Sequence, residues 1–245
     1  IKAQTTGNFY LPLEMSTYNY FLTAGKQYEN ILGIGYGIVV GLFFYHLFLL
    51  FLTKEKVQFF YILYVGCTLL FFASQQGSLF QFWPKSPQWN HLSFYSFCLL
   101  ALSSGLFFSR LFLNTKNNII LHKWMKNFAI SLALLSIFHV FLPTPLISIA
   151  CSIFGLLLII ALFIIAFRRY IEGFAEATLF LIAWGFLLIV VAAMIIMMNL
   201  GMGNINFAML LAQLAFAAQQ VLLSIGLAQR INSLKREKEQ TEKEI

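Results

Sequence analysis

Seven long apolar stretches, separated by short polar connections, fill most of the chain. Each stretch has about 20 residues, enough for an α-helix to cross the hydrocarbon core of a bilayer. Lipid offers no hydrogen-bond partners, so a spanning segment must pair its own backbone groups, as a helix does. The pattern therefore predicts an all-α membrane protein, a bundle of seven transmembrane helices. We expect the spans at about residues 31–52, 57–79, 91–109, 128–142, 146–167, 178–200 and 207–228.

The connections between these stretches carry residues that end helices. Pro84 and Pro87 follow the second stretch, and Pro143 and Pro145 follow the fourth. The fourth stretch is short for a span, so we expect its helix to begin several residues earlier, with Lys126 reaching toward the interface. The connection before it is amphipathic around residues 119–124, which predicts a segment lying along the membrane surface.

Both ends of the chain differ from the apolar stretches. Residues 1–30 are turn-rich and partly alternating, which predicts an extended segment and a polar linker outside the membrane. Residues 229–245 are highly charged, and the charged run continues to the last residue, so we expect a cytoplasmic domain to follow. Leu227, Ile231 and Leu234 repeat with heptad spacing, which predicts a signal output helix that pairs with a second copy as a coiled coil. A solvated single helix is the alternative. We therefore expect three parts: 1–30, the membrane domain 31–228 and the output helix 229–245.

The basic residues predict the orientation of the chain in the membrane. Hydrophobic residues make up 60% of the chain and charged residues 10%, with a formal net charge of +7. Thirteen of the 16 Lys and Arg residues fall on one side of the seven stretches, and only Lys2, Lys26 and Lys85 fall on the other. Cytoplasmic connections carry the excess of positive charge. The N-terminus is therefore expected outside and the C-terminus in the cytoplasm. The positive charge is explained by topology, so we predict no nucleic-acid partner.

The apolar stretches lack the side chains of several membrane activities. The chain has no Asp, and all nine Glu residues lie in connections or at the ends, which argues against proton or cation coupling inside the bilayer. The last stretch has no Lys to form a retinal Schiff base. No spacing places a nucleophile beside a base, and the three cysteines stand singly, as expected of buried free thiols. We therefore predict no catalytic residues, no metal site, no cofactor and no enzyme activity in this chain.

A few polar and small residues within the stretches are candidates for function. Polar side chains at the outer ends of the second and sixth stretches could line an outward-facing pocket, or could simply anchor helix ends in the headgroup region; they are Gln75, Gln76, Trp83, Trp89, Asn199 and Asn204. Gly33, Gly37 and Gly41 share a helix face and predict close helix packing, within the subunit or across a dimer.

Further polar residues lie deeper in the stretches. Gln213 and Gln220 share one face of the last stretch and are expected to bond neighbouring helices. His46 and His139 are expected near opposite membrane faces, each as a hydrogen-bonded structural residue.

Several segments, taken in order, resemble the bacterial seven-transmembrane receptors with diverse intracellular signalling modules. They are residues 33–37 (GIGYG), 45–48 (YHLF), 76–78 (QGS), 82–84 (FWP), 109–114 (SRLFLN) and 224–232 (SIGLAQRIN). Residues 7–13 also resemble the closing strand of the family's extracytoplasmic jelly-roll domain, which implies an upstream domain for a carbohydrate-like ligand. The resemblance further implies a bacterial inner-membrane location and a fused cytoplasmic output domain such as a histidine kinase or cyclase.

The sequence therefore favours a membrane sensor that passes an outside or membrane signal to a cytoplasmic output domain. Its expected partners are membrane lipids, an unknown extracytoplasmic ligand, the fused output domain and a second copy of the chain. A transporter or channel for a neutral solute is one alternative, although no proline interrupts the spans. A passive membrane anchor is the other alternative.

Overall fold

A computed structural model describes residues 17–115, 118–174, 176–199 and 205–244. These residues form seven α-helices and two short 3-10 turns, with no strand among them. The elements are α1 (Tyr18–Thr53), α2 (Lys56–Gln75), η1 (Ser78–Gln81), α3 (Pro87–Phe112), α4 (Ile119–Phe138), η3 (His139–Phe141), α5 (Thr144–Ile171), α6 (Ala177–Asn199) and α7 (Ile205–Glu244). Within the described part, all seven helices are long and apolar enough to cross a membrane. The predicted fold is confirmed, and the chain is a multi-pass membrane protein.

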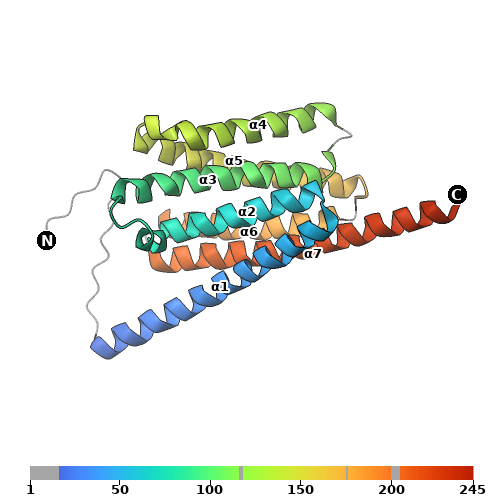
Figure 1. Cartoon of the computed structure of the whole chain (residues 1–245). Helices are drawn as coiled ribbons and strands as arrows, with labels where there is room; N and C mark the ends of the chain where they lie inside the picture. The colour runs from blue at the N-terminus through green and yellow to red at the C-terminus, as the bar shows by residue number, and fades with distance from the viewer. Residues whose placement is uncertain (1–16, 116–117, 175, 200–204, 245) are drawn as a thin grey trace.

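Five helices enclose the centre of the bundle. Helix α2 packs on α3, α3 on α5, α5 on α6 and α6 on α7, and α7 packs on α2 to close the ring. Helix α1 packs on α2 and α7, and α4 packs on α3. In Figure 1 the first turns of α1 stand away from the other helices, and α7 continues well beyond the bundle. The helix that leaves the membrane domain is therefore continuous with the one that packs inside it.

Local signals in the sequence account for most helix ends. Lys54 adopts a left-handed conformation (φ 53°) directly after α1, and Gly77 (φ 74°) does the same after α2. Pro87 occupies the first turn of α3, where its missing N–H removes no helical hydrogen bond. The side chain of Asn118 accepts a hydrogen bond from the backbone N–H of Leu121 (3.0 Å), which caps α4.

Some predicted boundaries are wrong. Residues 119–124 do not form a separate surface segment, because they are the first turns of α4; this confirms the early start expected for the fourth span. Helix α2 ends at Gln75, so the last residues expected in the second span form the turn and η1 instead. Helix α1 begins at Tyr18, which makes part of the expected polar linker helical. The extended run within residues 1–16 lies outside the described residues.

Aromatic rings fill the core between the helices. Phe108 and Phe112 of α3 are fully buried and pack against Phe180 of α6, with ring centroids 6.4 and 5.5 Å apart. Phe180 stacks in turn on Trp184 (5.8 Å), and Tyr61 of α2 contacts Phe108 (5.3 Å). These large side chains fix the spacing of α2, α3 and α6 around the centre of the bundle.

Candidate functional site

Buried polar side chains gather where α7 packs against α1 and α2, in what we call the polar seam. Most of its members are fully or nearly fully buried, which is costly inside a membrane unless each finds a partner. The polar seam consists of Tyr36 and His46 of α1, Gln58, Tyr61 and Tyr64 of α2, Gln76 after α2, and Gln213, Gln219, Gln220 and Ser224 of α7.

His46 joins all three helices at one end of the polar seam. Its Nε2 atom lies 2.7 Å from Ser224 Oγ on α7, and its Nδ1 atom contacts the amide nitrogen of Gln58 on α2. The same amide nitrogen donates to the His46 carbonyl oxygen (3.2 Å). The amide nitrogen of Gln58 can only donate, so the Nδ1 atom of His46 accepts from it. The imidazole proton is therefore assigned to Nε2, which donates to Ser224. The expectation of a hydrogen-bonded structural histidine is confirmed.

Two tyrosines of α2 form the middle of the polar seam. Tyr61 donates to the backbone carbonyl of Gln220 (2.8 Å), and Tyr64 donates to the side-chain oxygen of Gln219 (3.0 Å). The side-chain amide of Gln220 and the amide nitrogen of Gln219 are buried with no partner among the described residues. Gln220 therefore bonds a neighbouring helix through its backbone carbonyl, and its side-chain amide makes no hydrogen bond of ordinary geometry among the described residues.

Gln76 forms the other end of the polar seam. Its side-chain oxygen accepts from Tyr36 of α1 (3.1 Å), and its nitrogen donates to Gln213 of α7 (2.7 Å). The expected interhelix bond of Gln213 is confirmed. A void of about 20 Å³, lined in part by Gln213 and Gln220, lies beside this contact and has room for one water molecule.

The polar seam holds α7 with hydrogen bonds, but some of its buried polar atoms have no hydrogen-bond partner in the described structure. Within the described structure, Gln58, Gln213 and Gln219 each have one buried side-chain polar atom without a partner, and Gln220 has two. Buried polar groups without partners are costly, so these atoms are the least stabilised part of the contact between α7 and its neighbours.

A large apolar cavity lies beside the polar seam, inside the ring of five helices. Its volume is about 590 Å³, within the range of sites for small molecules. The hydroxyl groups of Thr68 and Ser152 bond carbonyls of their own helices, so they offer little to a polar ligand. Ile153 and Leu156 of α5 line the cavity and are also exposed on the helix surface, so the cavity reaches the lipid-facing side of the bundle.

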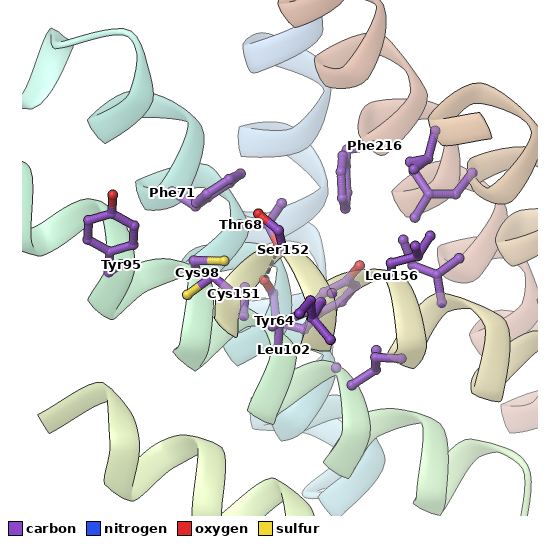
Figure 2. Close-up of a pocket in the computed structure, with 18 of the residues that line it drawn as sticks. Tyr64, Thr68, Phe71, Tyr95, Cys98, Leu102, Cys151, Ser152, Leu156 and Phe216 are labelled. Carbon is purple, nitrogen blue, oxygen red and sulfur yellow. Dashed lines mark hydrogen bonds between the residues drawn. The ribbon is translucent and has the colours of Figure 1, made fainter. Parts of the chain in front are cut away.

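Figure 2 shows how the cavity touches both α7 and the thiols. Tyr64 and Phe216 line it together, and Tyr64 is the same residue that bonds Gln219. Cys98 of α3 and Cys151 of α5 bring their sulfur atoms close together in the opposite wall. All three cysteines are free, as predicted. Tyr64 therefore lines the cavity with its ring and bonds α7 with its hydroxyl group.

The residues predicted to line an outward-facing pocket fall in different surroundings. Gln76 joins the polar seam, Gln75 and Trp89 are exposed, and Trp83 is half-buried with an indole N–H that has no partner in the described region. The described large cavity is lined by other residues. Asn199 is the last residue of α6, and its side chain and the whole of Asn204 lie outside the described part. The pocket stays a prediction.

The structure also shows the surroundings of the glycines predicted to pack helices and of the first residues of the predicted output helix. Gly33, Gly37 and Gly41 are exposed, and a Cβ added at any of them would meet no described atom within 4 Å. Packing within the subunit therefore gains no support, and dimer packing stays a prediction. Leu227 is buried in the core and Ile231 packs against it, so the first part of the heptad run serves the bundle itself. The side chain of Leu234 lies outside the described set.

Comparison with known proteins identifies the class of protein. The family model "7TM diverse intracellular signalling" matches residues 28–230. The chain therefore belongs to this family of seven-transmembrane signalling proteins. Neither a curated protein nor a solved structure matches the chain. The resemblance drawn from the sequence segments is confirmed, and the family points to a transmembrane sensor module.

Sequence reasoning missed six members of the polar seam: Tyr36, Gln58, Tyr61, Tyr64, Gln219 and Ser224. Tyrosine is common in membrane helices, so Tyr61 and Tyr64 gave no distinct signal. Gln58 was overlooked because it lies at the start of a span, where polar residues are expected. Gln219, adjacent to Gln220, could have been found by asking which neighbouring helix would satisfy each amide.

Proposed function

We propose that this chain is a transmembrane sensor in which an apolar molecule in the central cavity changes the position of α7. The shared role of Tyr64 carries the proposal, because its ring lines the cavity while its hydroxyl donates to Gln219 of α7 (3.0 Å). An occupant that displaces this ring weakens or redirects that hydrogen bond. Helix α7 continues to Glu244, so its displacement is transmitted beyond the bundle to a cytoplasmic output domain.

The chemistry of the cavity defines the class of input. Its walls are mostly aliphatic and aromatic side chains, and the hydroxyl groups of Thr68 and Ser152 are used by backbone carbonyls of their own helices. An apolar ligand that reaches the bundle through the lipid phase fits these walls, whereas a charged solute would lose its hydration without compensation. A ligand changes the balance between two positions of α7 only by the difference in its affinity for them.

The wider organisation belongs to the same proposal. The basic ends of the helices lie in the cytoplasm of a bacterial cell, following the excess of Lys and Arg on that side. An upstream domain that takes a carbohydrate-like ligand would supply a second input through α1. A second copy of the chain would pair through the exposed glycine face of α1 or beyond Leu234, and the output domain would follow the charged helix.

The test fills the cavity and measures output. The chain is fused after residue 245 to a reporter kinase or cyclase, and membrane levels are matched by immunoblot. Gly155 lines the cavity, and a Cβ there would meet no described atom within 4 Å, so Gly155→Leu occupies open space. The control Leu157→Phe adds bulk on the exposed face of the same helix. We expect Gly155→Leu to change reporter output at least threefold and Leu157→Phe to leave it unchanged.

A second variant tests the route from the cavity to α7. Tyr64→Phe keeps the ring and removes the hydroxyl that bonds Gln219, so it should reduce the response to Gly155→Leu by at least half. Equal output from Gly155→Leu and Leu157→Phe would contradict the sensor proposal and favour a passive anchor. Uptake of a labelled neutral solute by liposomes carrying the chain, blocked by Gly155→Leu, would favour transport instead.

A further inference from the structure

A second cavity, of about 350 Å³, lies at the end of the bundle from which α7 continues, and we call it the basic pocket. Lys54 and Lys56 reach it from the turn between α1 and α2, Arg110 from the end of α3 and Arg230 from α7. Among its described lining residues, Glu55 carries the single carboxylate. Four cationic side chains face one anionic side chain, so the basic pocket attracts anions.

Arg230 is engaged by backbone carbonyls, whereas two nitrogen atoms of Arg110 make no hydrogen bond in the described structure. The Arg230 guanidinium donates to the carbonyl oxygen of Leu111 (2.6 Å) and also to that of Phe112, and so caps the C-terminus of α3. Arg110 lies over the ring of Phe107, 5.6 Å from its centroid. Its Nε and Nη1 atoms are buried and have no hydrogen-bond partner among the described residues. Unsatisfied donors of a guanidinium are costly, so the side chain gains when it turns toward an anion that accepts from them.

The N-terminus of α2 adds backbone donors to the same place. Helix α2 begins at Lys56, and the side chain of its N-cap residue Glu55 makes no capping hydrogen bond. The first N–H groups of a helix have no intrahelical partner and carry a partial positive charge. Lys54 and Lys56 flank this terminus and are exposed, so they can fold over a bound group.

We propose that the basic pocket binds a phosphate group. The planar guanidinium of Arg110 can donate hydrogen bonds to two oxygens of a phosphate side by side, and the lysines contribute the remaining charge. The pocket lies at the ends of membrane-spanning helices, where the phosphates of lipid headgroups are found; basic pockets at this level suit anionic lipids. A soluble phosphate compound offers the same chemistry from the aqueous side. The proposal is independent of the apolar cavity and of the sensor function.

The experiment uses the whole chain, purified in a zwitterionic detergent. Thermal unfolding is followed with added phosphatidylglycerol or with inorganic phosphate, and phosphatidylcholine in place of phosphatidylglycerol controls for a general lipid effect. Arg110→Gln removes a guanidinium whose Nε and Nη1 atoms make no hydrogen bond in the described structure, so the variant should still fold. Arg168→Gln is the matched control, because Arg168 is exposed near the same end of the bundle and does not line the basic pocket.

We expect phosphatidylglycerol or inorganic phosphate to raise the unfolding temperature of the wild type and of Arg168→Gln. Arg110→Gln should need at least about tenfold more of the same probe for half of that shift, as expected when a charged hydrogen bond is lost. A shift with the lipid alone identifies a headgroup site, and a shift with inorganic phosphate alone identifies a soluble ligand. No shift with either probe, or equal shifts in Arg110→Gln and Arg168→Gln, would overturn the proposal.

Discussion

The hydrogen bond between Tyr64 and Gln219 is central to the proposed coupling, and its energy can be measured by a double-mutant cycle. Tyr64→Phe removes the hydroxyl, Gln219→Leu removes the amide, and the double variant removes both. The Tyr64 hydroxyl lies 3.0 Å from the Gln219 side-chain oxygen, and both residues are buried. Interhelix hydrogen bonds in membrane proteins average about 0.6 kcal/mol and reach about 1.7 kcal/mol. Because both groups are buried, we expect a coupling energy of about 1 kcal/mol, above that average.

The two single substitutions should not be equally costly. Tyr64→Phe leaves the Gln219 oxygen buried without a partner, in addition to the amide nitrogen that already lacks one in the described structure. Gln219→Leu strands only the Tyr64 hydroxyl and removes that second unpartnered atom. We therefore expect Tyr64→Phe to lower the free energy of unfolding by about 1–2 kcal/mol and Gln219→Leu to lower it by less.

Reversible unfolding in mixed micelles of sodium dodecyl sulfate and a mild detergent measures the four free energies. The control cycle pairs Tyr64→Phe with Ser131→Ala, since Ser131 is exposed on α4 and bonds only the Phe128 carbonyl of its own helix (2.8 Å). Distant pairs should be additive within about 0.3–0.5 kcal/mol. A coupling energy for Tyr64 and Gln219 no larger than that of the control cycle would refute the view that this bond holds α7.

Four further substitutions test packing and capping, and the effect of each is measured as a change in the free energy of unfolding in the same micelles. Gly105→Ala should destabilise by about 1–3 kcal/mol, because its Cβ would lie 3.2 Å from the Tyr64 ring, which cannot move without losing Gln219. Gly37→Ala has open space and should stabilise by up to about 1 kcal/mol, so an equal loss at both glycines would contradict the packing described. Phe108→Ala should cost about 3–5 kcal/mol, since this ring is fully buried among others, and a cost below about 1 kcal/mol would be inconsistent with that. Arg169→Gln removes a donor to the Leu113 carbonyl (2.9 Å) and should cost about 1.5–3 kcal/mol, whereas exposed Arg168→Gln should cost little.

The number and type of helices could be predicted from the chain alone because the solvent imposes them. A helix needs about 20 apolar residues to cross the hydrocarbon core, and such a stretch can be recognised in the sequence alone. The ends were less certain, since charged and aromatic residues tolerate the interface. Residues 119–124 illustrate this, because an amphipathic start to a span and a surface helix have the same pattern.

The candidate site was only partly visible in the sequence. Gln76, Gln213 and His46 stood out because polar side chains inside apolar stretches need partners. Which partner each finds depends on the order of helices around the bundle, and nothing in local periodicity encodes that order. Gln213 and Gln220 share a face of α7 but make different contacts. The side chain of Gln213 accepts from Gln76, which follows α2, whereas the backbone carbonyl of Gln220 accepts from the hydroxyl of Tyr61.

By itself, the sequence determined that seven helices cross a membrane and that their basic residues gather toward one side, because burial in lipid is a property of each segment separately. The tertiary structure alone decided that Tyr64 lies between a cavity and α7, and that Arg110 lines the same pocket as Arg230. Both features depend on side chains from helices that are far apart in the chain. Only the packing of the bundle brings those helices together.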